Sequence, residues 1–186
     1  MNTHNFPEEA ASVITFWFEE ITEKQWYKKD DEFDALLTQR FGDLLNRARV
    51  GECYTWRETA LGRLAEIIVL DQFSRNIFRD SPLAFAQDAQ ALVLAQEAVA
   101  LGALEALNSP QQAFMLMPYM HSESALIHVQ AVIQFQRPGL ENNLNFEHRH
   151  KDIIDKFGRY PHRNSVLGRE SNEGEVAFLK TPGSSF

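Results

Sequence analysis

The sequence predicts an all-α protein, built as a right-handed stack of antiparallel helix hairpins. Apolar residues recur at steps of three and four nearly throughout the chain, and no run alternates between polar and apolar residues for long enough to form a strand. The 9 glycines and 7 prolines are too few for a sandwich or a barrel with many tight turns. A length of 186 residues fits one helical domain, in which residues 180–186 are expected to form a loose tail.

The charge of the chain argues against several kinds of partner. The formal net charge is −8, and a nucleic-acid binder needs a positive surface, so we expect no nucleic-acid partner. The longest apolar stretches are far below the ~18 residues that span a bilayer, and the start MNTHNFPEEA lacks the features of a secretory signal. Cys53 is the one cysteine, which fits a reducing compartment. We therefore expect a cytoplasmic protein that does not associate with membranes.

Three helices are expected in the N-terminal part. The proline and acids at Pro7–Glu9 suit the first turn of a helix, and an apolar stripe continues from there to Trp17. A second stripe occupies residues 33–48, and Gly51 after it suits a C-terminal cap. A third helix is expected from about residue 56 to residue 76.

Prolines mark the next three helix starts. The serine–proline pair 81–82 suits an N-cap followed by the first turn of a helix that continues to residue 102. Ser109 begins another helix, with Gln112 placed to complete a capping box. Pro118 is expected to restart the chain for the helix that follows.

The last helices are marked by their ends. The apolar stripe of residues 146–157 stops at Gly158, which suits a C-terminal cap. Asn172, with Glu175 three residues later, begins a final short helix. The alanine-rich helix at 84–103 resembles the second helix of a tetratricopeptide unit, because small residues let neighbouring helices approach closely. The predicted stack is therefore tetratricopeptide-like.

Polar residues interrupt the apolar stripe at the end of the expected third helix. Asp71 and Arg75 lie four residues apart on that stripe, and Asn76 adds a polar group beside them. An exposed ion pair at this spacing contributes only about 0.2–0.5 kcal/mol, whereas a buried one needs further partners. A structural ion-pair network and a ligand site both stay open for these residues.

Histidines contribute a second group of candidate residues. His121 and His128 are seven residues apart, roughly 10 Å along a helix, which is too far for them to share a metal. A zinc site would have to be assembled from distant segments, such as His121, Glu123, His150 and His162. His150 lies on an apolar stripe, where a hydrogen-bonded core histidine is the alternative. We expect no metal and no cofactor.

The run FGRYPHRN at residues 157–164 carries the most informative polar cluster. Arg159, His162, Arg163 and Asn164 lie within six residues of one another. Arginine pairs grip carboxylate or phosphate oxygens, and a histidine can act as an acid or a base near neutral pH. Alternatively, the arginines pair with internal carboxylates and attach the C-terminal end to the bundle. Such carboxylates are Asp71, Asp88 and Glu123.

Four separated motifs resemble a known family. They are LDQFSRNIFR (Leu70–Arg79), AFAQDAQAL (Ala84–Leu92), FMLMPYMHSES (Phe114–Ser124) and FGRYPHRNSVLGR (Phe157–Arg169). Together, and in this order, they are similar to an uncharacterised bacterial family, the domain of unknown function 924. The resemblance covers nearly the whole chain. It implies an all-helical, tetratricopeptide-like fold and supplies no established activity.

These observations favour a cytoplasmic helical binding module of unknown biological role, with a polar pocket for a small anion or an acidic peptide terminus. The expected ligand-binding residues are Asp71, Arg75, Asn76, His121, Glu123, His150, Arg159, His162, Arg163 and Asn164. The partner would be the small anionic ligand or the acidic peptide, and a homodimer is left open.

Two alternatives to a binding module are kept. The first is a hydrolase or transferase in which His162 or His121 acts as general acid/base. No G-x-S-x-G elbow and no phosphate-binding glycine loop occurs to support a more specific enzyme class. The second is a structural scaffold that contacts its partner through aromatic residues. Whether the chain is an enzyme therefore stays open.

Overall fold

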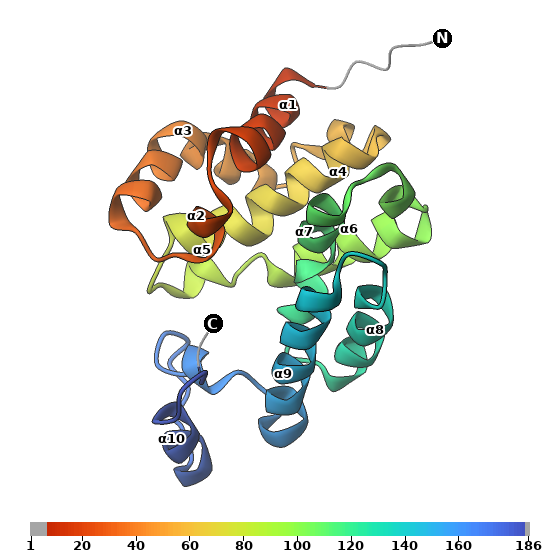
Figure 1. The fold of residues 1–186 in the computed structure, drawn as a ribbon. Coiled ribbons are helices and arrows are strands. Elements are labelled where there is room, and N and C mark those ends of the chain that lie inside the picture. Colours follow the sequence, from red (N-terminus) through yellow and green to blue (C-terminus); the bar gives the residue numbers. More distant parts are fainter. Residues whose placement is uncertain (1–6, 185–186) are drawn as a thin grey trace.

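The computed structural model describes residues 7–184, and every regular element in this range is helical (Figure 1). The α-helices are α1 (Glu8–Thr15), α2 (Glu23–Tyr27), α3 (Asp31–Arg49), α4 (Ala60–Ile67), α5 (Ser74–Ile77), α6 (Asp88–Ala100), α7 (Ser109–Met120), α8 (Ala125–Phe135), α9 (Glu141–Phe157) and α10 (Glu173–Leu179). Short 3-10 turns lie at Tyr54–Glu58, Pro82–Ala84, Ala103–Ala106 and Pro161–Arg163, and π-helical turns at Phe16–Glu20 and Ile68–Phe73. The all-α prediction is confirmed, whereas the tetratricopeptide-like stacking and the single domain stay predictions.

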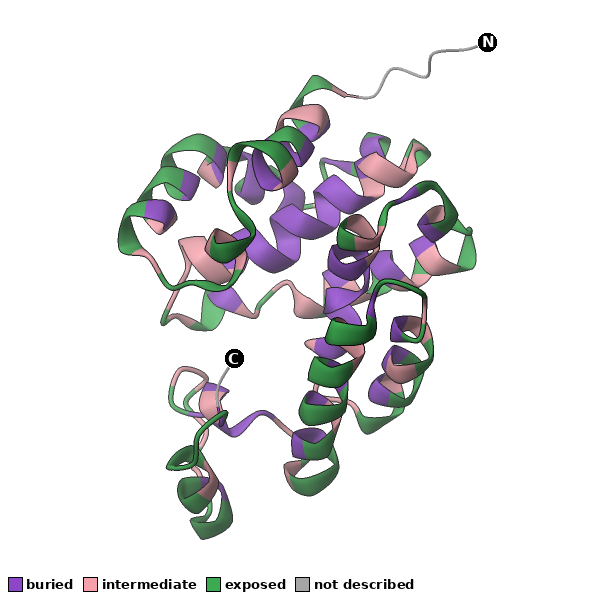
Figure 2. Cartoon of the chain, in the orientation of Figure 1, coloured by how far each residue is buried: buried purple, intermediate pink, exposed green. Residues whose placement is uncertain are grey.

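The segment from α4 to α5 lies at the centre of the N-terminal part. Every residue from Leu64 to Ser74 is buried, and Figure 2 shows α4 as a buried helix among partly exposed neighbours. Helix α4 packs against α1, α6 and α7, and the π-helical turn after it packs against α3. A stretch that is covered on all sides holds its polar side chains inside the protein. Asp71 and Gln72 are buried for this reason.

The C-terminal part consists of the hairpins of α7, α8 and α9, followed by a segment that folds back. Helix α8 packs against both α7 and α9. Gly158, with a φ of +70°, ends α9 as expected, because glycine adopts the left-handed conformation without strain. Residues 158–184, called the C-terminal segment below, then leave the hairpins, and α10 lies apart from the other helices (Figure 1).

The expected third helix is divided into four short elements. Thr59 caps α4 by accepting a hydrogen bond from the backbone N–H of Gly62 at 3.0 Å, so residues 54–58 form a separate turn. A side chain at Gly62 would place its Cβ only 1.9 Å from the carbonyl oxygen of Trp56, which explains the glycine. The π-helical turn at Ile68–Phe73 then interrupts the regular α-helical hydrogen bonding before α5.

The starts of α6, α7 and α8 differ from the prediction. The serine–proline pair 81–82 opens a 3-10 turn, and α6 begins only at Asp88. Asn108 rather than Ser109 caps α7, because its side chain and that of Gln111 bond reciprocally to each other's backbone N–H at 3.1 Å. Pro118 does not restart the chain but lies inside α7.

The end of the chain agrees in part with the sequence prediction. Asn172 and Glu175 form the expected capping box of α10. In the expected tail, the Ser184 hydroxyl donates a hydrogen bond to the carbonyl oxygen of Leu179 at 3.1 Å, and the part at 185–186 lies outside the described residues. Across residues 7–184, no helix combines the length and the apolar character that a bilayer span requires.

Candidate active site

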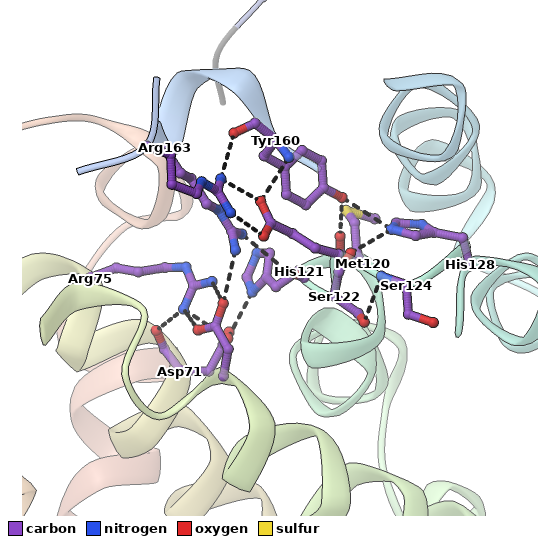
Figure 3. Close-up of polar contacts among 12 residues, drawn as sticks. Asp71, Arg75, Met120, His121, Ser122, Ser124, His128, Tyr160 and Arg163 are labelled. Carbon is purple, nitrogen blue, oxygen red and sulfur yellow. Dashed lines mark hydrogen bonds and ion pairs between the residues drawn. The ribbon is translucent and has the colours of Figure 1, made fainter. Parts of the chain in front are cut away.

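A hollow of about 380 Å³ opens between the start of α6, the end of α7 and the C-terminal segment. Its polar lining is Asp88, His121, Ser122, Glu123 and Arg163. Figure 3 shows that Asp71 and Arg75, behind this lining, converge on His121 and Arg163. Three of the separated sequence segments singled out above therefore meet at one place.

Asp71 is an ionised carboxylate inside the protein. It lies in the π-helical turn and is fully buried. Its Oδ1 accepts hydrogen bonds from His121 Nδ1 at 2.7 Å and from Arg75 Nη1 at 3.0 Å, and its Oδ2 accepts one from Gln72 at 2.5 Å. Burial acts to raise the pKa of Asp71, but the charge of Arg75 and these hydrogen bonds outweigh it and hold the pKa well below its usual range.

His121 is a neutral imidazole directed at the hollow. Its backbone N–H bonds to the carbonyl of Met117 at the end of α7, and 17% of its side chain is exposed. Burial, with the nearby charge of Arg75, lowers the pKa of His121 below its usual 6.5. Since Asp71 only accepts hydrogen bonds, Nδ1 carries the proton and Nε2 the lone pair. Within residues 7–184, Nε2 has no hydrogen-bond partner.

The arginines beside this pair are already balanced by carboxylates. Arg75 donates to both oxygens of Asp88, at 2.8 and 3.0 Å. Arg163 Nη1 donates to Asp88 at 3.1 Å and Nη2 to the backbone oxygen of His121 at 3.1 Å. The Arg163 guanidinium also lies 4.6 Å from the ring centres of Phe85 and Tyr160. Ligand binding and internal pairing with a carboxylate were both open for Arg163, and its contacts are those of internal pairing.

Glu123 and Arg169 attach the C-terminal segment to the turn after α7. Arg169 donates to both oxygens of Glu123, at 2.6 and 2.8 Å, and the backbone N–H of Tyr160 donates to the same carboxylate at 2.7 Å. The sequence pattern assigned no role to Arg169. The bidentate pair fixes one wall of the hollow, which includes Leu167.

Three predicted site residues make their contacts away from the hollow. Asn76 donates to Asp34 at 2.8 Å. Arg159 pairs with Glu175 of α10, at 2.7 and 2.8 Å, which leaves it away from the hollow. Asn164 donates to the hydroxyl of Ser171 at 3.0 Å and braces the C-terminal segment internally.

His150 and His162 pack around Tyr160 instead of lining the hollow. Their ring centres lie 5.7 and 5.5 Å from that of Tyr160, and His150 Nδ1 donates to the backbone oxygen of Phe146 at 2.8 Å. Burial lowers the pKa of His150 to about 3 and that of His162 to about 4, so both are uncharged at neutral pH. Within residues 7–184, no three potential ligands gather as a metal site would require, so nothing supports the zinc alternative.

A second histidine–carboxylate pair lies beneath the hollow and was missed in the sequence. His128 and Glu147 are fully buried, and His128 Nδ1 lies 2.7 Å from Glu147 Oε1. His128 Nε2 lies 2.8 Å from the backbone oxygen of Ser122 and 3.2 Å from the hydroxyl of Tyr160. A carbonyl only accepts hydrogen bonds, so Nε2 carries a proton, and a second proton lies between Nδ1 and Glu147. Spacing alone gave no signal for this pair.

Comparison with known proteins places the chain among proteins of unknown function. Residues 13–183 match the model of a family described as bacterial protein of unknown function (DUF924). The chain is also similar to a solved structure, the protein of unknown function ATU0120 from Agrobacterium tumefaciens. The two share 34% identity at a TM-score of 0.88, over 92% of this chain and 97% of that one. No curated protein matches the chain. The chain thus belongs to the DUF924 family, a family of bacterial helical proteins.

Proposed function

We propose that the hollow is the active site of a hydrolase in which His121 acts as general base. One observation carries the proposal: His121 Nδ1 is 2.7 Å from the ionised Asp71, while the opposite nitrogen of the ring has no hydrogen-bond partner within residues 7–184. A carboxylate that orients one ring nitrogen leaves the other as a base of defined direction. The lowered pKa keeps this base deprotonated at neutral pH.

The surrounding residues have complementary roles in the proposed reaction. His121 Nε2 takes a proton from water, the water oxygen bonds to an ester carbonyl carbon, and the carbon–alkoxide bond then breaks. The proton passes from His121 to the departing alkoxide, so the products are an acid and an alcohol. Asp71 stabilises the transient imidazolium. Arg163 uses one N–H of each terminal nitrogen within the described chain, so the remaining two are donors for the oxyanion.

The second candidate function is the binding of a small anion or an acidic peptide terminus. It is favoured by the same unused N–H groups of Arg163, a residue of the hollow's lining. Asp88 and Glu123 line the same hollow and repel an anion. Since Asp71 and Asp88 together balance the charges of Arg75 and Arg163, we place catalysis ahead of anion binding.

The test compares ester hydrolysis by the wild type with that of His121→Gln, using 4-nitrophenyl esters from acetate to octanoate. We expect the substitution to lower kcat/KM by about 10²–10⁴-fold, as loss of a general base does. His148→Gln is the matched control, because His148 is exposed on α9. Equal rates for wild type and His121→Gln, with both folded, would contradict the proposal.

A second readout needs no substrate. Diethyl pyrocarbonate acylates neutral imidazole nitrogens that carry an accessible lone pair. We expect His121 to be modified before His128, whose Nε2 is bonded to a carbonyl. Modification in the reverse order would remove the physical basis of the proposal. For the second candidate, acetate or phosphate would raise the melting temperature of the wild type and not that of Arg163→Lys.

The remaining predictions about partners and location stay predictions. They are the cytoplasmic location, the absence of nucleic-acid and membrane partners, and the homodimer that the sequence leaves open.

A further inference from the structure

The hollow has an apolar wall beside its polar lining. That wall is formed by Pro82, Phe85, Ala86, Ala89, Leu92 and Leu167. Ala89 and Leu92 are three residues apart and lie along one side of the start of α6, and Phe85 lies in the turn before that helix. Ala89 is exposed, and Leu92 is partly exposed. The apolar wall is therefore accessible from the hollow.

The charged groups of the hollow are already neutralised by neighbours in the protein. Asp88 is shared by Arg75 and Arg163, and Glu123 is held by both terminal nitrogens of Arg169. His121 is neutral. Asp71 also pairs with Arg75, so two carboxylates balance the two guanidiniums of Arg75 and Arg163. The hollow therefore offers hydrogen-bonding groups beside apolar side chains and no excess charge of either sign for a ligand.

The size of the hollow limits its occupant. A volume of about 380 Å³ lies at the lower end of the range of roughly 300–1,000 Å³ for small-molecule sites. The alanines at 86 and 89 leave room beside α6 that a larger side chain would fill. An apolar group of a small ligand therefore has room to lie against α6.

From these features we infer that the substrate is an uncharged ester with a short alkyl or acyl chain, which lies against Ala86, Ala89 and Leu92 while its carbonyl faces His121 and Arg163. The inference rests on the proposed function for the identity of the reacting group. The apolar wall and the balanced charges support the chain specificity independently of any turnover.

The test measures binding of straight-chain primary amides, from propanamide to octanamide, by NMR titration of the wild-type protein. Amides carry the carbonyl but resist hydrolysis. We expect the dissociation constant to fall by about fourfold for each added methylene until the hollow is filled. The strongest shifts are expected at the methyl groups of Ala89 and Leu92. Octanoate, the anionic counterpart, is expected to bind more weakly than octanamide.

Ala89→Leu supplies the specific perturbation. It adds three carbons to the apolar wall, so the gain with chain length should stop about three methylenes earlier than in the wild type. Ala100→Leu is the matched control, since Ala100 is an exposed alanine of the same helix outside the hollow. Equal effects of the two substitutions, an affinity that does not change with chain length, or tighter binding of octanoate would each overturn the inference.

The outcomes separate this inference from the proposed function. Hydrolysis that depends on His121 but shows no chain-length dependence in amide binding overturns the substrate class alone. Amide binding that follows chain length, with hydrolysis unaffected by His121→Gln, supports the apolar site and overturns the general-base proposal.

Discussion

Two histidine–carboxylate pairs lie close together in this protein and differ in what the second ring nitrogen does. In both pairs the histidine Nδ1 is 2.7 Å from a carboxylate oxygen, namely His121 with Asp71 and His128 with Glu147. His128 Nε2 is occupied by the backbone oxygen of Ser122. The Nε2 of His121, a ring that lines the hollow, has no such partner within the described chain. The same short contact to a carboxylate therefore leaves His121 as a base and makes His128 a structural anchor.

The two carboxylates also differ, both in the partners that they have and in the direction of their pKa shifts. Arg75 and several hydrogen bonds keep Asp71 ionised, with a lowered pKa. Among the described residues 7–184, Glu147 has no arginine partner and one of its oxygens accepts no hydrogen bond, and burial raises its pKa. The His128–Glu147 pair, called the anchor below, stabilises the turn that carries His121, because its bond to Ser122 is made one residue further along the chain.

The largest expected effect comes from breaking the anchor. Glu147→Ala removes one partner of a fully buried pair, which costs about 3–5 kcal/mol in the free energy of unfolding. Urea denaturation measures it. Glu147→Gln retains a hydrogen-bonding group and is expected to cost clearly less. If Glu147→Ala cost less than about 1 kcal/mol, the pair would not be the anchor described here.

The pH dependence of stability should distinguish the two pairs. His121 has a folded pKa below its unfolded value of 6.5, so the unfolded chain binds more protons as the pH falls below 6.5, and stability is lost on acidification. Each such proton contributes a slope of up to about 1.4 kcal/mol per pH unit. Glu147 has a raised pKa, so its contribution is present below pH 4.5 and is lost as the pH rises through the folded pKa.

Single substitutions test the sign of each residue's pH-dependent contribution to stability separately. His121→Gln is expected to reduce the loss of stability between pH 6.5 and pH 4. The buried His150 and His162, whose pKa values are lowered to about 3 and about 4, contribute to the remaining loss. Glu147→Gln is expected to act with the opposite sign above pH 4.5. Denaturation midpoints across pH 4–8 measure both. A wild-type profile without a slope below pH 6.5 would contradict this assignment of protons.

The smallest effect is expected outside both pairs. Asn76→Ala removes the hydrogen bond to Asp34 at 2.8 Å and should cost about 1 kcal/mol of stability. Because Asn76 does not reach the hollow, amide binding and the titration of His121 should not change. A change in either would show that the Asp34 contacts are coupled to the hollow.

The sequence predicted the residues at the centre of the polar cluster better than it predicted which neighbouring residues lie outside it. Asp71 and Arg75 share one face of a helix at a spacing of four, which the π-helical turn did not separate, and Arg163 does approach them. Asn76 follows one residue later, a turn of about 100° around a helix, and so points to Asp34.

The remaining contacts of the site join segments that are far apart in the sequence, so the sequence did not predict them. The acids and arginines of this chain have many partners of opposite charge, and only the folded structure shows that Arg159 pairs with Glu175 and Arg169 with Glu123. His128 lies on a helix of mostly apolar residues, and the carboxylate that makes it an anchor is 19 positions away in the chain. Residue pattern along one helix carries no information about such a partner.

The most direct measurement is the pH titration of the histidine side chains by nitrogen-15 NMR. We predict that His121 is neutral at pH 7, with its proton on Nδ1 and an unprotonated Nε2, and that its pKa lies below 6.5. A His121 ring that is charged at pH 7, or that carries its proton on Nε2, would contradict the general base on which the account depends.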